Sequence, residues 1–228
     1  MNILYEGTLR QGPSFIVRPL QEIDLPKILA LQEAVIAALE NKSVLQPLYE
    51  KEFRYILNGK GMLVGAWVEE ELIAFRALLV PPLDDEHLGL DAGIEDLSRV
   101  IYQEISNVHP AYRGNHLQQK LAKILMDELK KEGERFDYVC CTVAPFNFPS
   151  LKDKFSQEMQ IAALKEKYGG SLRYVFVKEL TDVNPSWTES QKVLMKDTAR
   201  QQELLAGGWR GVGMMVVGED SLVEYRKS

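Results

Sequence analysis

Cysteine is scarce in this 228-residue sequence, which contains only two. The two are adjacent, Cys140 and Cys141, and lie in an apolar run typical of a strand, where successive side chains point to opposite faces. This arrangement disfavours both a bond between them and a shared metal ion. We therefore expect reduced, packed thiols instead of a disulfide framework or a metal site.

Long hydrophobic runs and an excess of positive charge are absent as well. No stretch of about 18 or more apolar residues could span a bilayer, and the opening MNILYEGTLRQG lacks the basic-then-apolar order of a signal peptide. The 27 Lys and Arg residues against 33 Asp and Glu leave a net charge of −6, which disfavours nucleic acid as a partner. We expect a cytoplasmic protein that binds neither membranes nor nucleic acid.

The sequence also has no internal repeat, low-complexity segment or clear linker. An apolar share of 46% and a charged share of 26% are typical of a globular protein, and the length favours one domain. Alternating and helical patterns predict an α/β (α+β) order. The expected elements are a strand at 15–20, helices at 24–39 and 49–57, a hairpin at 61–80, a strand at 100–108, a helix at 117–131, a strand at 136–145, a helix at 150–168, a strand at 171–180, a helix at 186–207 and a hairpin at 209–228.

The segment VHPAYRGNHLQQKL, which begins at Val108, joins an apolar strand to an amphipathic helix. The first turn of a helix leaves main-chain N–H groups unpaired and carries partial positive charge, so it can hold a phosphate. Gly114 allows close approach of the backbone, and Arg113 adds a permanent charge. An Arg-Gly turn alone is a weak signal, because such turns are also common as solvent-exposed connections.

The order of elements resembles that of the GNAT acetyltransferase superfamily over roughly residues 15–180, and the hairpin strand near 208–217 completes it. The segment HPAYRGNHLQ is similar to the family's Pro-x-Tyr-Arg-Gly-x-Gly-x-Gly pyrophosphate loop, and Asn147-Phe148-Pro149-Ser150 replaces its Asn-x-x-Ala helix start. His116 and Gln118 depart from the pattern, because they stand where glycines are usual. The resemblance implies a mixed, mostly antiparallel sheet of about seven strands with helices on both faces, in a single domain covering 1–228.

The resemblance further implies acetyl-CoA as cosubstrate and no metal. By position in the motif, main-chain groups of Ser106 and Val108 would hold the acetyl carbonyl and the pantetheine amide, and Asn147 would contact the pantetheine arm. Asn147 and Ser150 could instead only cap a helix, and both roles can coexist. The pyrophosphate would be received by Arg113, Gly114, Asn115, His116, Leu117 and Gln118, with Lys120 or Lys123 near the adenosine 3′-phosphate.

Transfer of an acetyl group to an amine needs a base, because amines are mostly protonated at neutral pH. Glu104 is the only acid on the strand before the loop, and strand alternation predicts that it shares a face with Tyr102 and Ser106. We assign Glu104 and Ser106 as candidate catalytic residues. A structural alternative for Glu104 is a pair with a nearby arginine or a place on a polar sheet face.

The acid that protonates the leaving thiolate is not determined. Where many family members carry a tyrosine, seven residues after the asparagine, this chain has Lys154. Tyr168, Tyr174 or solvent could replace it. His109 and His116 are more often packed or phosphate-facing than catalytic at such places, and the two cysteines have no evident base for a nucleophilic role.

The leading hypothesis is thus an N-acetyltransferase that moves acetyl from acetyl-CoA to a primary amine of a small molecule or peptide by direct attack. The alternatives are a non-catalytic acyl-CoA-binding regulatory module and a scaffold domain. Two features bear on specificity. An acidic loop from Asp84 to Asp96 would favour cationic amines, unless it is only a solvated surface. A helical insertion at about 181–208 would form one wall of the amine site, or would pack on a sheet face or a partner subunit. A homodimer is left open.

Overall fold

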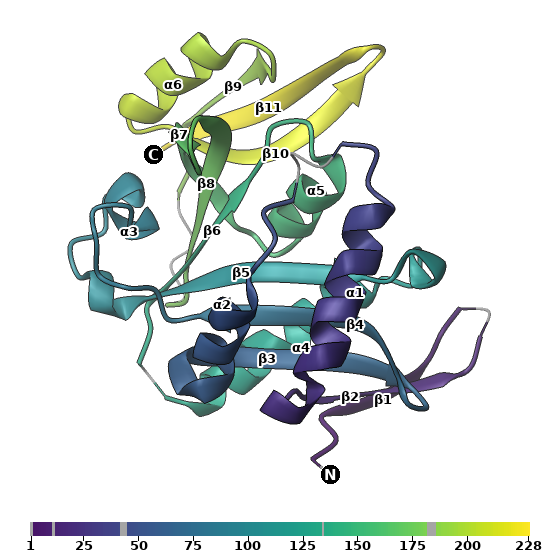
Figure 1. Ribbon diagram of the computed structural model, residues 1–228. Coiled ribbons are helices and arrows are strands. Elements are labelled where there is room, and N and C mark those ends of the chain that lie inside the picture. Colours follow the sequence, from purple (N-terminus) through teal and green to yellow (C-terminus); the bar gives the residue numbers. More distant parts are fainter. Residues whose placement is uncertain (1, 11, 42–44, 134, 182–185) are drawn as a thin grey trace. The chain divides into compact units, whose positions relative to one another are not determined.

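The computed structural model describes residues 2–10, 12–41, 45–133, 135–181 and 186–228, and the chain divides into two compact units (Figure 1). Unit 1 comprises Met1–Pro81 and Ile101–Arg135, and unit 2 comprises Pro82–Val100 and Phe136–Ser228. No helix in these described stretches is both long and apolar enough to cross a membrane.

Unit 1 is built on antiparallel strands in the order β1-β2-β3-β4-β5, and each pair is formed by chain neighbours. Valine, isoleucine and aromatic residues occupy many of their buried positions, as suits a pleated surface, and leucine and alanine occupy most of the others. The strands are β1 (Tyr5–Thr8), β2 (Ser14–Pro19), β3 (Gly61–Val68), β4 (Glu71–Leu79) and β5 (Val100–Val108).

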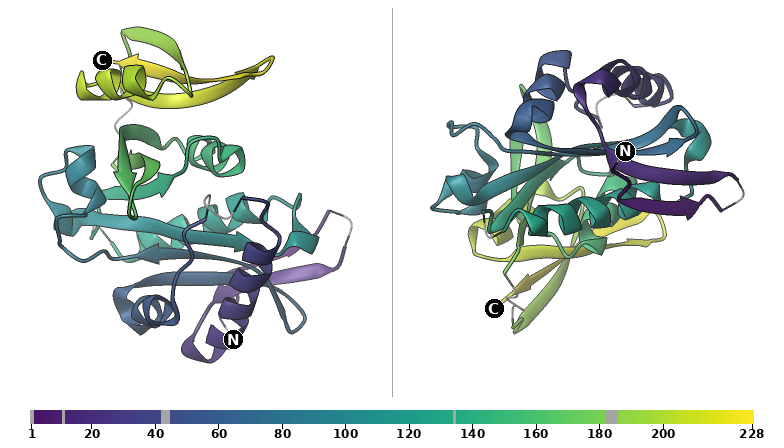
Figure 2. Two further views of the ribbon diagram at one scale, coloured as in Figure 1. Left: turned by 45° about the horizontal axis from the view of Figure 1, so that its top comes forward. Right: turned by 90° about the horizontal axis from the view of Figure 1, so that it is seen from below.

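Helices cover both faces of the unit 1 strands (Figure 2). Phe75 of β4 contacts Phe53 of α2 (Glu50–Tyr55), with ring centroids 5.7 Å apart. The next residue, Arg76, points to the opposite face and donates to the main-chain oxygen of Gln118 in α4 (Leu117–Lys131). Helix α1 (Leu25–Ala37) packs with α2, and Ile28, Leu31 and Val35 join the same buried cluster as Phe75. The expected arrangement of helices on both faces is confirmed in this unit.

Unit 2 has strand order β6-β8-β7-β10-β11-β9, again with antiparallel neighbours. Gln201 of this unit has no solvent exposure, and its Oε1 accepts from the hydroxyls of Tyr174 (2.7 Å) and Tyr225 (2.9 Å). The elements are α3 (Leu88–Ala92), β6 (Tyr138–Val143), α5 (Phe148–Ser156), β7 (Gln160–Lys167), β8 (Ser171–Glu179), β9 (Glu189–Leu194), α6 (Thr198–Ala206), β10 (Arg210–Val217) and β11 (Asp220–Lys227).

Three expectations need correction. The described residues form eleven strands, not about seven, although the mostly antiparallel character is confirmed. The predicted helix over 150–168 ends at Ser156, and Glu158 takes a left-handed φ of 61° before β7 begins. Alanine, leucine, lysine and glutamate favour helix in isolation, but here seven residue pairs with β8 override that propensity.

The insertion helix expected at about 181–208 is also shorter than predicted. Residues 182–185 lie outside the described residues, and Glu189–Leu194 form strand β9 paired with β11. Helix α6 begins only at Thr198, where the side chain of Asp197 accepts a hydrogen bond from Arg200 N (3.1 Å). The Ser-x-x-Glu pattern at Ser186 therefore does not start this helix, and Asp197 does.

Candidate functional site

The loop between β5 and α4 forms the helix N-terminus that the sequence predicted. Gly114 has φ +82°, and a side chain there would meet no atom within 4 Å, so this backbone is open to solvent. The first main-chain bond of α4 runs from Lys120 N to His116 O (3.0 Å). The N–H groups of residues 117–119 therefore have no acceptor within the helix, which is the arrangement that favours an anion.

His116 occupies the helix N-cap with φ +55°, a conformation that is costly for a residue with a side chain. This backbone explains why the related motif has glycine at that position. Gln118 is different, because it already lies in regular helix, where no glycine is required. The two departures from the motif thus leave the main-chain donors in place.

Three exposed or half-exposed cations surround this turn: Arg113, Lys120 and Arg10 of the β1–β2 connection. Lys120 Nζ donates to the hydroxyl of Tyr5 (2.8 Å), and Arg10 contacts the ring of His116 (2.5 Å). Among the described residues no carboxylate pairs with any of the three. Arg10 was not predicted as a site residue, because more than one hundred positions separate it from the loop.

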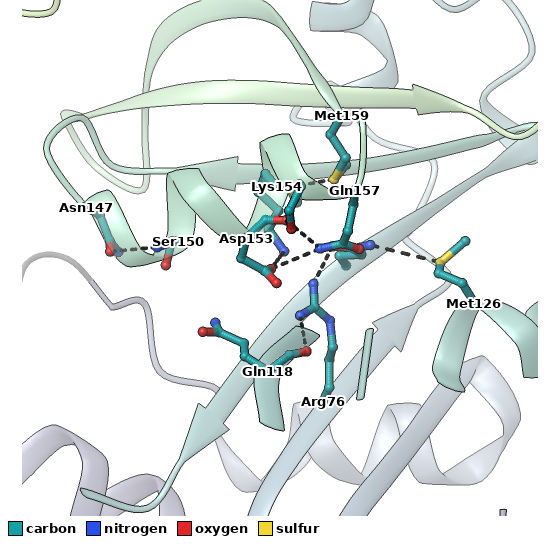
Figure 3. A network of polar contacts seen from close by, with 12 residues as sticks. Arg76, Gln118, Met126, Asn147, Ser150, Asp153, Lys154, Gln157 and Met159 are labelled. Carbon is teal, nitrogen blue, oxygen red and sulfur yellow. Dashed lines mark hydrogen bonds and ion pairs between the residues drawn. The ribbon is translucent and has the colours of Figure 1, made fainter. Parts of the chain in front are cut away.

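A buried guanidinium supports the turn from below. Arg76 is 1% exposed, and it donates to the main-chain oxygen of Gln118 (3.1 Å; Figure 3). It also donates to Oε1 of Gln103 (2.6 Å). A buried charge needs such partners, and breaking them would leave it uncompensated. Arg76 therefore fixes the first turn of α4 against the sheet and places a positive charge beneath it.

Strand β5 contains a bulge, which the sequence analysis did not detect. Ile105 pairs with Ala77 and Gln103 pairs with Leu78, so Glu104 is the additional residue on this strand. A bulge interrupts the alternation of faces. As a result, Ser106 lies opposite Arg76 on the α4 side, whereas Tyr102 lies opposite Leu79, which packs on the core with α1 and α2. The prediction that Tyr102 and Ser106 share a face is therefore wrong.

Glu104 is half-buried, and burial raises its pKa from 4.5 to about 7, with a smaller contribution from the charge of Glu52 on α2. Within the described part of the chain Glu104 has no ion pair or hydrogen bond, so the alternative of an arginine partner is not observed. A carboxyl group with a pKa near neutrality can both accept and return a proton at physiological pH.

Ser106 and Val108 lie at the end of β5, next to the loop. Ser106 Oγ is buried and has no hydrogen-bond partner among the described residues, and Val108 pairs with Ala74 of β4. The roles predicted for both residues involve their main-chain groups and not their side chains. Glu104, Ser106, Val108 and the α4 turn all lie in unit 1.

Asn147 and Ser150 belong to unit 2. Asn147 caps α5, because its Oδ1 accepts from Ser150 N (3.3 Å; Figure 3). The helix-capping role that the sequence offered as an alternative for this pair is therefore present. The preceding Phe146 is 51% exposed with φ +65°, which is uncommon for an aromatic residue.

The candidates for the leaving-group acid are not equally suitable. Lys154 is buried and pairs with Asp153 (3.2 Å), and Tyr174 is fully buried, where burial raises its pKa. Tyr168 is half exposed and bonds Thr142 Oγ1 (2.9 Å), so it remains the accessible hydroxyl of the two tyrosines. Cys140 and Cys141 are buried thiols, and burial raises the pKa of Cys140, which opposes a nucleophilic thiolate.

The acidic loop of unit 2 is partly neutralised by lysines of β7. Asp91 pairs with Lys165 (2.6 Å) and Lys167 (2.7 Å), and Glu86 pairs with Lys167 (3.3 Å). These pairs weaken the prediction that this loop attracts cationic amines. Among the described residues no group of three or more His, Cys, Asp or Glu could hold a metal ion.

A surface hollow of about 750 Å³ lies elsewhere on unit 1, between α1, the β3–β4 turn and the segment after β5. Glu69, Glu70 and Glu71 line it together with His109 and Tyr112. The hydroxyl of Tyr112 donates to Glu71 (2.8 Å), and His109 Nδ1 accepts from Ala111 N (3.2 Å). His109 therefore has a local structural role, as expected, and the hollow contains none of the predicted site residues.

No protein-family model and no curated protein sequence matches this chain. Solved structures do match its fold. The ribosomal-protein-S18-alanine N-acetyltransferase from Escherichia coli has a TM-score of 0.56 at 17% identity, covering 77% of this chain and 99% of that one. The GNAT domain of an S. lividans protein named PAT has a TM-score of 0.55 at 17% identity, covering 77% and 96%.

A Salmonella typhimurium protein, described as an acetyltransferase and solved with its cofactor acetyl-CoA, has a TM-score of 0.55 at 16% identity. The match covers 75% of this chain and 97% of that chain. The chain therefore has the fold of the GNAT acetyltransferases, as the order of its elements predicted. At this identity the likeness concerns the fold alone.

Proposed function

We propose that the protein is an acetyl-CoA-dependent N-acetyltransferase that acts on a primary amine of a small molecule or peptide. The observation that carries the proposal is the α4 N-terminal turn, which follows directly on the bulged strand that bears Glu104. Its first N–H groups have no acceptor within the helix, and the cations beside it have no carboxylate partner in the part of the chain that the structure describes. The fold supports it, because the structures named above are described as acetyltransferases. Those descriptions do not favour the alternative of a non-catalytic binding module.

The residues of the turn fit a diphosphate group. Main-chain donors of residues 117–119 point out of the helix start, Gly114 leaves space above them, and Arg113 can pair with a phosphate oxygen. Arg76 adds a buried positive charge below. We assign Arg113 to Gln118 as the segment that receives the pyrophosphate of acetyl-CoA.

In the proposed reaction Glu104 takes a proton from the substrate ammonium, directly or through one water. The freed amine nitrogen bonds to the acetyl carbon while the carbon–sulfur bond breaks, and the thiolate leaves with the electron pair of that bond. As the amide forms, the nitrogen releases its second proton to solvent. Main-chain groups of Ser106 and Val108 hold the acetyl carbonyl and the pantetheine amide, which stabilises the developing oxyanion. Solvent or Tyr168 returns a proton to the thiolate, which needs little assistance because a free thiol has a pKa of about 8.5.

Asn147 and Ser150 are proposed to contact the pantetheine arm in addition to their capping interaction. The support is the match between Asn147 and the asparagine of the related motif. Oδ1 of Asn147 accepts in the cap, and the proposed contact with the pantetheine arm is assigned to its amide group, which is a donor.

A thiol-release assay tests the function. Acetyl-CoA would be mixed with the protein and a panel of polyamines, aminoglycosides, amino acids and peptides, and the free thiol would be measured. The proposal requires amine-dependent thiol release that Glu104→Gln reduces strongly. Saturable CoA binding without thiol release from any amine would indicate a binding module instead.

A further inference from the structure

The connection between β1 and β2 reaches the phosphate-binding turn. Arg10 in that connection donates its main-chain N–H to Oδ1 of Asn115 (2.9 Å), and its Nη2 lies 2.5 Å from Nε2 of His116. Asn115 in turn donates its Nδ2 to Tyr112 O (3.0 Å), which fixes the amide orientation. Two residues of the loop are thus fastened to a segment far away in the sequence.

The direction of this contact follows from the two groups involved. A guanidinium can only donate, so Nε2 of His116 is the acceptor. Of the five N–H donors of a guanidinium, one is used by His116 and four remain. Arg10 is exposed, and within the described residues no carboxylate neutralises it, although the chain carries a net charge of −6.

We propose that Arg10 is a further cosubstrate-binding residue, which donates to the diphosphate of acetyl-CoA alongside Arg113. The proposal rests on the proposed function. His116 and Asn115 act as positioning residues, because they hold the Arg10 guanidinium and main chain at the edge of the α4 turn. A glycine, which is usual in the related motif at the position of His116, could not make this side-chain contact with Arg10.

The test is a calorimetric titration of the full-length protein with CoA and with 3′-dephospho-CoA. We expect Arg10→Ala to weaken both ligands about five- to tenfold, as suits a partly exposed charge-assisted contact. Arg10→Lys, which keeps the charge but not the planar fork, should lose less. Neither substitution removes the main-chain bond to Asn115, so the hairpin should stay in place, and ligand-free melting temperatures check this.

Lys130→Ala is the matched control. It removes one exposed positive charge from the last turn of the same helix, about 20 Å from its start and thus beyond the screening length at physiological salt. Its affinity for both ligands should stay within about twofold of the parent, because a screened charge contributes little.

Asn115→Ala tests the positioning role through a double-mutant cycle. If Asn115 acts partly through Arg10, the combined loss in Arg10→Ala/Asn115→Ala will be smaller than the product of the two single losses. A combined loss equal to that product would assign Asn115 an independent contact and overturn its positioning role.

The outcomes separate this inference from the function itself. Failure of the unmodified protein to bind CoA would contradict the proposed function. Tight CoA binding that Arg10→Ala leaves unchanged would overturn the role of Arg10 alone. A loss seen with CoA but not with 3′-dephospho-CoA would overturn the diphosphate assignment, because it would place Arg10 at the 3′-phosphate.

Discussion

Replacing Glu104 by glutamine should make the protein more stable at neutral and alkaline pH while impairing its activity. Burial holds the pKa of Glu104 at about 7 instead of 4.5, so the folded state keeps a proton that the unfolded state loses between these two values. Stability should therefore fall as the pH rises from about 4.5 to about 7 and then stay level. The difference in pKa corresponds to on the order of 3 kcal/mol as an upper estimate.

The glutamine side chain does not titrate, so the Glu104→Gln variant should escape this loss. Denaturant unfolding at several pH values is the appropriate assay. Below about pH 4.5 the parent and the variant should be alike, and above about pH 7 the variant should gain up to on the order of 3 kcal/mol. Glu33→Gln, at an exposed helix position, is the matched control and should show no such trend.

Activity should change in the opposite direction. The amide cannot accept a proton, so kcat should fall about 10²- to 10⁴-fold at neutral pH, with partial recovery at higher pH where more of the amine is free. Glu52→Gln should lower the pKa of Glu104 and move the acidic limb of the rate profile to lower pH, because Glu52 contributes to the raised value. Parallel stability curves for parent and Glu104→Gln, or a variant with full turnover, would refute the reasoning.

Substitutions at three further positions test the proposed contacts by CoA titration. Gly114→Asp should abolish binding, whereas Gly133→Asp, at a similar positive φ and equally open space, should not; equal losses would point to backbone strain alone. Arg113→Ala should weaken binding more at low than at high salt, and salt-independent loss would argue against direct pairing. Asn147→Asp should keep the α5 cap but weaken CoA binding, while Asn147→Ala should also lower stability by about 1 kcal/mol; normal CoA affinity in both variants would leave Asn147 a cap only.

The end of β5 at Val108 and the start of α4 at Leu117 could be predicted from the sequence. Their signals are local: alternation of apolar residues gives way to apolar spacing of three and four, with Gly114 between. The buried stripe of α4 follows from the same pattern, and Leu121, Leu125 and Leu129 are buried as expected.

Long-range contacts account for what the sequence did not reveal. The bulge at Glu104 depends on the register between β4 and β5, which local alternation cannot encode. The sequence shows that Arg76 interrupts an apolar strand, but it does not show that its guanidinium reaches the main-chain oxygen of Gln118. Arg10 lies far in the sequence from His116, the loop residue that it contacts. The segments that form β7 and β9 were predicted as helix, because the strands that they pair with are not visible in the local pattern of either segment.

The most direct test of the central claim is a calorimetric titration of the unmodified protein with CoA. The account predicts saturable binding at one site per chain, a rise in melting temperature with ligand concentration, and weaker binding at higher salt because cations contact the phosphates. Absence of heat and of any melting shift at millimolar CoA would contradict it.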